Sequence, residues 1–333
     1  MNRRQALRGG AAAGILAACG CAPNVQSALT PFPDFSGPHF EDEAFVSFDG
    51  APLGLTHWQS AAPPWAVIVG LHGMNDYANT FHMAGPYWAE RGVTTYAYDA
   101  RGHGRSPNRG EWGGEYLMTE DLRTACRVAR ARHPDALLAV VGESMGGATA
   151  IAAFGSSAPP DADRLVLCAP AVWGWSELPD AYALTLWLTA HTLPSRRVTP
   201  PRNVARRIVP SDNIEMLRAL GRDRLMLFET RIDALYGLVT MMEIAQERVS
   251  QIPASSAFLY GARDQIIPRP AAERAARQLP AGARTALYAN GYHMLLRDLQ
   301  ATVVFEDILA FLKDAAAPFP SAAPPLLQLQ ANR

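Results

Sequence analysis

One serine stands between two glycines in the stretch V-G-E-S-M-G-G, which covers residues 141–147. The apolar run LLAVV before it has the pattern of a buried strand, and the small residues MGGATAIAAF favour a helix. Ser144 therefore lies at a strand-to-helix turn, where Gly142 and Gly146 relieve backbone crowding. The G-x-S-x-G pattern is typical of a nucleophile elbow, although a tight turn with a capping serine has the same pattern.

A serine hydroxyl needs a histidine to take its proton and a carboxylate to orient that histidine. His293 lies in NGYHMLL, between the last expected strand and the last expected helix. Asp264 follows the preceding strand, in LYGARDQIIP. The chain order Ser144, Asp264, His293 predicts a catalytic triad.

An acyl-transfer site also needs two backbone N–H groups for the oxyanion. One is expected from Met145, the residue after the nucleophile. The other is expected from Met74, in the loop LHGMNDY that follows a buried strand at residues 66–71. His72 and Gly73 shape this loop, because glycine lets the backbone approach a substrate closely.

Alternating strands and helices must position these residues. Asp49-Gly50 signals a hairpin between the first two strand candidates. The expected strands are AFVSF, LGLTHW and residues 66–71, 94–99, 137–141, 164–170, 256–261 and 284–289. The expected helices are 77–90, 118–133, the one after Ser144, 269–279 and one near 299–314. This order predicts a mostly parallel eight-stranded sheet with helices on both faces.

Residues 171–252 interrupt the alternation and are interpreted as an inserted helical cap, so the core comprises residues 41–170 and 253–314. The tail 315–333 is expected to be disordered. One group of cap residues either lines an acyl channel or packs the cap: Trp173, Trp175, Leu184, Leu186, Trp187 and Leu188. An arginine group either meets phosphate headgroups or forms a solvated face: Arg196, Arg197, Arg202, Arg206 and Arg207.

The N-terminus resembles a bacterial lipoprotein leader. A basic start with Arg3-Arg4 precedes a short apolar run, and Leu16-Ala17-Ala18 stands directly before Cys19. We therefore expect a signal peptide at 1–18, lipid on Cys19 and a tether over 19–40. The protein would then be exported and anchored to a membrane, facing the periplasm or the exterior. The alternative is an ordinary secretory signal, cut near Ala18 or Ala22.

The composition narrows the classes of partner. Thirty basic and 31 acidic residues give a net charge of −1, which argues against nucleic acid. Cys126 and Cys168 are expected to be buried free thiols, although an exported protein can oxidise them. The sequence has no metal-ligand spacing, so no metal or cofactor is expected.

Several further polar residues attract attention. His103 and Asp99, in YDARGHGRSP, are interpreted as structural and not as an acid–base pair. His72 is expected to brace its own loop. Asp121 is expected near the start of a helix, as a cap or a favourable charge. Glu143 either tunes the polarity of the pocket or makes an ordinary loop contact.

Together these motifs resemble the monoacylglycerol lipase and lysophospholipase branch of the α/β-hydrolase superfamily, which includes the S33-type hydrolases. The matching stretches are LHGMNDYANTF, YDARGHGRSP, GESMGG, LCAP, LYGARDQIIP and GYHMLLRD, in family order over roughly residues 45–312. The resemblance implies an α/β-hydrolase fold with a helical cap. It also implies the triad Ser144, Asp264 and His293. The cap shows little similarity, which leaves the substrate open.

The expected function is therefore a serine hydrolase that cleaves carboxylic esters through an acyl-enzyme on Ser144. Monoacylglycerols or lysophospholipids are the favoured substrates, and no oligomeric state is implied. One alternative is an imino-peptidase or amidase, for which the cap lacks an acidic cluster that could bind a free amine. The other is a non-catalytic surface lipoprotein on a hydrolase scaffold.

Overall fold

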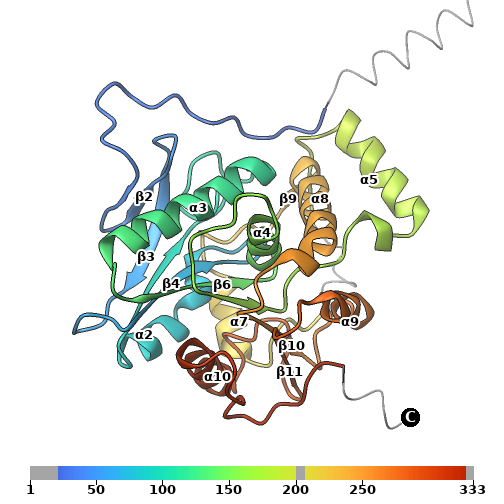
Figure 1. The fold of residues 1–333 in the computed structure, drawn as a ribbon. Coiled ribbons are helices and arrows are strands. Elements are labelled where there is room, and N and C mark those ends of the chain that lie inside the picture. Colours follow the sequence, from blue (N-terminus) through green and yellow to red (C-terminus); the bar gives the residue numbers. More distant parts are fainter. Residues whose placement is uncertain (1–21, 200–206, 328–333) are drawn as a thin grey trace, which may run out of the picture.

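The computed structural model describes residues 22–199 and 207–327, and a nine-stranded sheet runs through its centre (Figure 1). The strand order is β1-β2-β3-β5-β4-β6-β7-β10-β11. The bounds are β1 His39–Phe40, β2 Ala44–Val46, β3 Pro52–Trp58, β4 Ala66–Leu71, β5 Val93–Tyr98, β6 Leu137–Glu143, β7 Arg164–Cys168, β10 Ser256–Gly261 and β11 Arg284–Tyr288. Two short strands, β8 Arg197–Val198 and β9 Thr230–Arg231, form a separate antiparallel pair.

The α/β fold class is confirmed, with one more strand than expected. The pairs from β5 to β11 are parallel, and β1, β2 and β3 extend that edge with antiparallel pairs. The ninth strand is β1, which has only two residues and so gives no alternating pattern in the sequence. β2 and β3 form the hairpin signalled by Asp49-Gly50.

The helices differ from expectation mainly at their ends. The expected helix over 77–90 is a 3-10 turn, η1, followed by the short α2, and the helix expected from Met118 begins earlier, at Gly114. The bounds are η1 Ala78–Phe81, α2 Ala84–Ala89, α3 Gly114–Arg132, α4 Met145–Phe154, η2 Trp175–Glu177, α5 Asp180–Thr192, α7 Ile214–Leu220, α8 Ile232–Arg248, η3 Val249–Gln251, α9 Arg269–Gln278 and α10 Ala301–Lys313.

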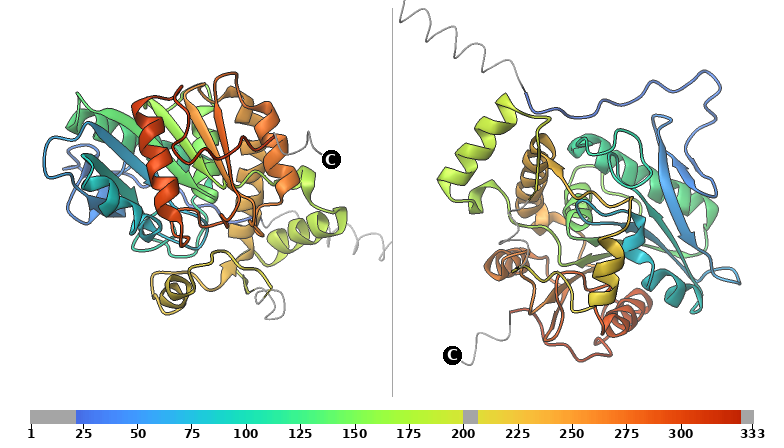
Figure 2. Two further views of the ribbon diagram at one scale, coloured as in Figure 1. Left: turned by 90° about the horizontal axis from the view of Figure 1, so that it is seen from below. Right: turned by 180° about the vertical axis from the view of Figure 1, so that it is seen from behind.

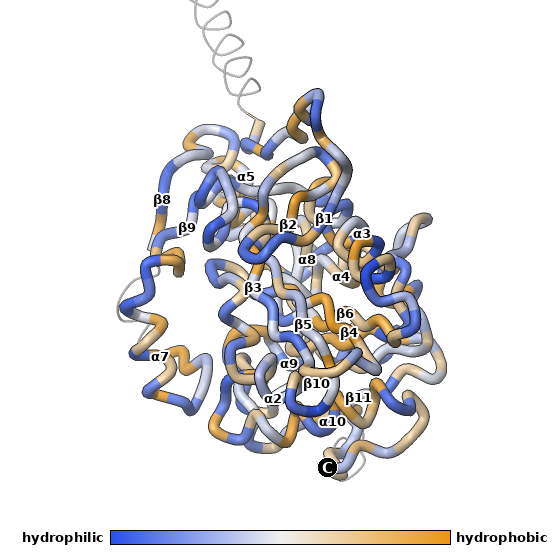
Figure 3. Tube along the Cα trace, turned by 90° about the vertical axis from the view of Figure 1, so that its left-hand side faces the viewer, coloured by the Kyte–Doolittle hydropathy of each residue, from blue (hydrophilic) through white to orange (hydrophobic). Residues whose placement is uncertain are grey.

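Two hydrophobic layers cover the two faces of the sheet. Successive residues of β4 alternate between them, so that Val67 and Val69 face the layer of α3, α4 and α8, whereas Ile68 faces the layer of α2 and α10. Figure 2 shows α10 across its face of the sheet, and Figure 3 shows that β4 and β6 are among the most hydrophobic segments. Burial on both faces explains why these strands are continuously apolar.

The expected cap divides into two parts. α5 projects from the body of the molecule in Figure 1, and its side chains are mostly exposed or half-buried. α8 instead packs on α4, with Met242 and Ala245 in the same hydrophobic layer as Ile151. The expected cap boundary at residue 252 is therefore wrong, because α8 belongs to the helical layer of the core.

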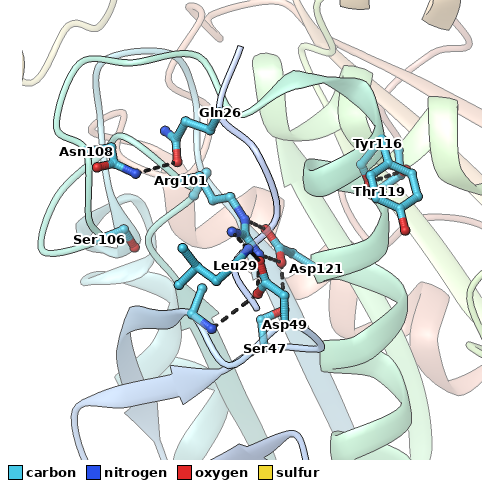
Figure 4. A network of polar contacts seen from close by, with 12 residues as sticks. Gln26, Leu29, Ser47, Asp49, Arg101, Ser106, Asn108, Tyr116, Thr119 and Asp121 are labelled. Atoms are coloured by element: carbon cyan, nitrogen blue, oxygen red, sulfur yellow. Dashed lines mark hydrogen bonds and ion pairs between the residues drawn. The ribbon is translucent and has the colours of Figure 1, made fainter. Parts of the chain in front are cut away.

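Residues 22–35, named the strap here, run along the surface of the core, and the expected flexible tether is wrong for this part of the chain. The Gln26 N–H donates to the Trp112 carbonyl (2.9 Å), and the Leu29 N–H donates to Oδ2 of Asp49 (2.8 Å). Asp49 is itself bound by the buried guanidinium of Arg101, which joins the strap to the interior (Figure 4).

Arg101 also binds Asp121, in the second turn of α3 (Figure 4). Asp121 is 1% exposed and also accepts a hydrogen bond from Ser47 (2.6 Å), so the expectation of a helix cap is wrong. Burial raises the pKa of Asp121. Burial also acts to raise the pKa of Asp49, but the bonds and charge of Arg101 outweigh it and leave that pKa below its usual value.

The expected disorder of the tail is wrong for residues 315–327. Leu326 is fully buried, and its N–H donates to Oγ1 of Thr285 (3.0 Å). Ser321 donates through its hydroxyl to Asp307 on α10 (2.5 Å). The many prolines and alanines of this segment hide its packing from a reading of composition alone.

The expected signal peptide at 1–18, Cys19 and the first residues of the expected tether lie outside the described residues, as do residues 328–333 of the tail. Over residues 22–199 and 207–327, no helix is both long enough and apolar enough to cross a membrane.

Candidate active site

Ser144 occupies a strained turn between β6 and α4. Its backbone angles are φ 53° and ψ −115°, in a region that non-glycine residues rarely adopt, and its side chain makes no cap hydrogen bond to α4. A Cβ at Gly142 would lie 2.6 Å from the Gly146 carbonyl oxygen, so no larger residue fits there. These features match a nucleophile elbow and not a capping serine.

Asp264 and His293 meet at the carboxyl edge of the sheet, where β10 and β11 end. Nδ1 of His293 lies 2.9 Å from Oδ2 of Asp264, and the Asp264 side chain is completely buried. The second carboxylate oxygen accepts the N–H groups of Ile266 (2.7 Å) and Ile267 (3.0 Å). These bonds fix the plane of the carboxylate and hence the direction of the imidazole.

The two expected oxyanion donors come from two separate segments near the serine. Met145 begins α4 directly after Ser144, and Met74 lies in the loop after β4 and borders the same cavity as Ser144. In the described part of the chain, neither backbone N–H has a hydrogen-bond acceptor. A Cβ at Gly73 would lie 3.3 Å from Cβ of Ser144, so a larger residue there would crowd the Ser144 side chain.

His72 braces its own loop, as expected. The Ala100 N–H donates to Nε2 of His72 (2.8 Å), which leaves Nδ1 to donate to the Gly73 carbonyl (2.7 Å). Burial lowers the pKa of His72, and this neutral tautomer suits both bonds.

His103 and Asp99 have structural contacts, as expected. Nδ1 of His103 is 3.1 Å from the Arg101 carbonyl oxygen, and burial together with the charge of His72 lowers the pKa of His103 to about 3. Asp99 is fully buried and accepts hydrogen bonds from the backbone of Ala78 and from Arg105. Neither His103 nor Asp99 borders the cavity at Ser144.

A cavity of about 890 Å³ opens above the serine, large enough for a lipid-sized ligand. Ser144 and His293 both border it. α5 contributes Tyr182 and Leu186 to its wall, and α8 contributes a largely apolar face. The α8 residues on the wall are Ile232, Leu235, Leu238, Val239 and Met242.

The aromatic and leucine residues of the cap fall into two sets, those that border the cavity and those that do not. Trp173 and Leu186 border the cavity. Leu184, Trp187 and Leu188 are 66%, 47% and 49% exposed and do not border it, and Trp175 packs against Tyr236. Of the arginine group, Arg196, Arg197 and Arg207 are exposed, and Arg202 and Arg206 lie outside the described residues.

A charged cluster forms the polar end of the cavity. The fully buried Arg297 contacts Asp76 (Nη2–Oδ2 2.5 Å) and Glu143 (Nη2–Oε1 3.0 Å). Burial raises the pKa of Glu143 despite the nearby guanidinium. Glu143 thus lies on the pocket, one of the two roles expected for it, whereas the sequence analysis missed Asp76 and Arg297. The sequence feature that could have revealed them is a charged residue within a motif that borders the site: Asp76 in LHGMNDY and Arg297 in YHMLLRD.

Both remaining cysteines are buried and free, as expected. Burial raises the pKa of the Cys126 thiol to about 12 and that of Cys168 well above its usual value. Neither thiol borders the cavity at Ser144.

Comparison with known proteins gives a consistent result. A family model described as "Serine aminopeptidase, S33" matches residues 62–300, which include the expected triad and both expected oxyanion donors. A monoacylglycerol lipase of Mycolicibacterium smegmatis is 23% identical over 295 residues, covering 81% of this chain and 96% of that protein.

Solved structures share the fold. A monoacylglycerol lipase of Paleococcus ferrophilus aligns with a TM-score of 0.63 and 19% identity, covering 78% of this chain and 98% of that one. A soluble variant of monoglyceride lipase from Saccharomyces cerevisiae, in complex with a substrate analogue, aligns with a TM-score of 0.67 and 17% identity, covering 86% and 99%.

Proposed function

The chain belongs to the serine aminopeptidase S33 family, and from that membership we propose that it is a carboxylic ester hydrolase whose nucleophile is Ser144. The observation that carries this assignment is the strained Ser144 turn, which faces a cavity shared with a carboxylate-held histidine. Asp264 and His293 complete the triad. Met74 and Met145 supply the oxyanion donors.

In this mechanism His293 takes the proton of the Ser144 hydroxyl as its oxygen attacks the ester carbonyl carbon. The negative charge on the former carbonyl oxygen is received by the N–H groups of Met74 and Met145. Collapse of the tetrahedral intermediate expels the alcohol, which takes its proton from His293, and leaves an acyl group on Ser144. Water, deprotonated by His293, then releases the acid.

The substrate we propose is a monoacylglycerol or a lysophospholipid. The apolar wall formed by Trp173, Leu186 and α8 suits an acyl chain. The relatives with similar sequences include a monoacylglycerol lipase, whose name supports the same class of substrate. The amidase alternative has less support, because both carboxylates on the pocket, Asp76 and Glu143, already contact the positive charge of Arg297.

The test is a panel of p-nitrophenyl esters, monoacylglycerols, lysophospholipids and aminoacyl anilides, with fluorophosphonate labelling followed by intact mass. The wild type should hydrolyse esters and take up one label. Ser144→Ala and His293→Ala should each lose on the order of 10⁴-fold or more in kcat, with an unchanged melting temperature. If Ser144→Ala kept a tenth of the activity, or if anilides were the better substrates, the assignment would be wrong.

We also propose that Cys19 carries lipid and anchors the enzyme on the non-cytoplasmic side of a membrane. Two features support this. The strap reaches the end of α5, where Asn24 donates to the Ser195 hydroxyl (3.3 Å). α5 also exposes an apolar group consisting of Tyr182, Leu184, Trp187, Leu188 and, just beyond its end, Leu193. An anchor close to residue 22 would bring this group to the lipid surface.

Fractionation and palmitate labelling of wild type and Cys19→Ser test the anchor. The wild type should incorporate label and sediment with membranes, and Cys19→Ser should do neither. Cys21→Ser is the matched control and should behave as the wild type. An unlabelled wild type would refute the lipid anchor.

A further inference from the structure

Arg297 is the largest charged side chain that is fully buried in the described part of the chain. It follows His293 by four residues, and its N–H donates to the Met294 carbonyl (2.8 Å) in the same loop. Its guanidinium contacts Asp76, in the loop after β4, and Glu143, the last residue of β6. One side chain thus joins three segments that border the cavity at Ser144.

Each carboxylate that Arg297 contacts is next to an expected oxyanion donor. Asp76 is two residues after Met74, and it also accepts the Tyr77 N–H (2.8 Å) and the Thr80 hydroxyl (3.1 Å). Glu143 directly precedes Ser144 and is two residues before Met145. The guanidinium therefore bridges the two backbone segments that supply the oxyanion donors, and it belongs to the loop that supplies the base.

The cluster is poorly explained as a purely structural ion pair. Two carboxylates share one guanidinium, and the formal charge of the three groups is −1. Among the described residues, Nε and Nη1 of Arg297 and Oε2 of Glu143 have no hydrogen-bond partner although all three atoms are buried. Buried ion clusters with incomplete hydrogen bonding are costly compared with apolar packing, so stability alone does not favour this arrangement.

The charge of Arg297 also matters to the reaction. Negative charge develops on the substrate oxygen, and Glu143 and Asp76 border the cavity that would hold the substrate. In a poorly solvated pocket, two uncompensated carboxylates would oppose that charge. Burial acts to lower the pKa of Arg297, but Asp76 and Glu143 outweigh it and hold the guanidinium in its charged form.

We propose that Arg297 is a positioning residue for the oxyanion site. It ties the Met74 loop to the Ser144 elbow at a fixed separation, and it compensates the two carboxylates that border the cavity beside the oxyanion donors. This inference rests on the proposed ester hydrolysis. It predicts an effect on kcat and not on KM, because the oxyanion exists only in the transition state.

The experiment compares three variants with a short-chain p-nitrophenyl ester, which does not depend on the acyl wall. Arg297→Lys keeps the charge but loses the fork that spans two loops. Arg297→Met removes both the charge and the fork. The triple variant Asp76→Asn/Glu143→Gln/Arg297→Met removes all three charges with little change in volume, so it should fold even if Arg297→Met does not.

We expect Arg297→Met to lower kcat about 100-fold, the effect of losing one oxyanion donor, with KM changed less than two-fold. Arg297→Lys should recover part of that loss. The triple variant should keep the melting temperature of the wild type while its kcat stays at least ten-fold reduced. A triple variant with wild-type kcat, or equal changes in kcat and KM across the series, would overturn the proposal.

Arg101→Lys is the matched control. Arg101 is also a buried arginine that bridges two carboxylates, Asp49 and Asp121, but it does not border the catalytic cavity. The substitution Arg101→Lys should lower the melting temperature and leave kcat unchanged. Failure of the underlying function would look different, because the wild type would then hydrolyse no ester or Ser144→Ala would remain active.

Discussion

The two carboxylate oxygens of Asp264 have different partners: one contacts the imidazole of His293, and the other accepts hydrogen bonds from the backbone of its own loop. Oδ2 lies 2.9 Å from Nδ1 of His293, and Oδ1 accepts the N–H groups of Ile266 and Ile267. The two amide donors make one side of the carboxylate an obligate acceptor. These bonds hold the carboxylate in its loop with its other oxygen directed at the imidazole.

This division makes Asp264→Asn informative. The amide oxygen of asparagine must face the two backbone donors, so its NH₂ group is directed at Nδ1 of His293. Nδ1 then becomes an acceptor, and Nε2 carries the proton that it should be free to take from Ser144. We expect kcat to fall about 10⁴-fold with little change in melting temperature. A kcat above a tenth of the wild-type value would show that this carboxylate does not set the tautomer.

Two leucines on α5 give a matched test of the acyl wall. Leu186 borders the cavity, whereas Leu188 is 49% exposed and does not. Leu186→Ser should raise KM for a dodecanoyl ester about ten-fold, because it removes roughly 1.5 kcal/mol of apolar contact, and should hardly affect a butanoyl ester. Leu188→Ser should leave both KM values unchanged. Equal effects of the two substitutions would place the acyl chain elsewhere.

Asp298 predicts a pH dependence of stability. It is 1% exposed, accepts the Ser211 hydroxyl (2.7 Å) and the Tyr292 N–H (2.7 Å), and burial raises its pKa to about 6 from 3.8. The folded protein therefore holds this proton more tightly than the unfolded chain does. The stabilisation that comes from protonated Asp298 is lost as pH rises from about 4 to 6.

Asp298→Asn removes this titration. The free energy of unfolding of the variant, minus that of the wild type, should increase as pH rises from 4 to 6 and stay level above pH 7. Urea unfolding at intervals of one pH unit measures the difference. A difference that is constant or decreasing over that interval would contradict the raised pKa.

The elbow and the triad order were predictable because they are local patterns at element ends. Ser144, Asp264 and His293 each follow a strand of a parallel sheet, and such strands bring their carboxyl ends to one edge. The start of α3 was not predictable, because Gly113 and Gly114 resemble a loop and no side chain caps the helix. β1 was too short to show a period.

The roles that the sequence did not reveal depend on contacts between segments that are far apart in the chain. Asp121 resembles a solvent-facing residue of a helix until Arg101 and Ser47 are placed beside it. Leu186 and Leu188 have the same type and helical context, and only the direction of the cavity distinguishes them. Arg297 required knowledge that the Asp76 and Glu143 loops converge on it. No spacing in one sequence encodes such convergence.

The packing of α8 limits which segment of this protein can be exchanged by engineering. This helix contributes to the pocket wall, and it also packs on α4, the helix that begins directly after Ser144. A graft of residues 171–252 from another hydrolase would therefore disturb the core as well as the specificity. A graft limited to 173–227 would exchange α5 and α7 and leave α8 in place. That shorter interval is the natural cassette for altering which esters this scaffold accepts.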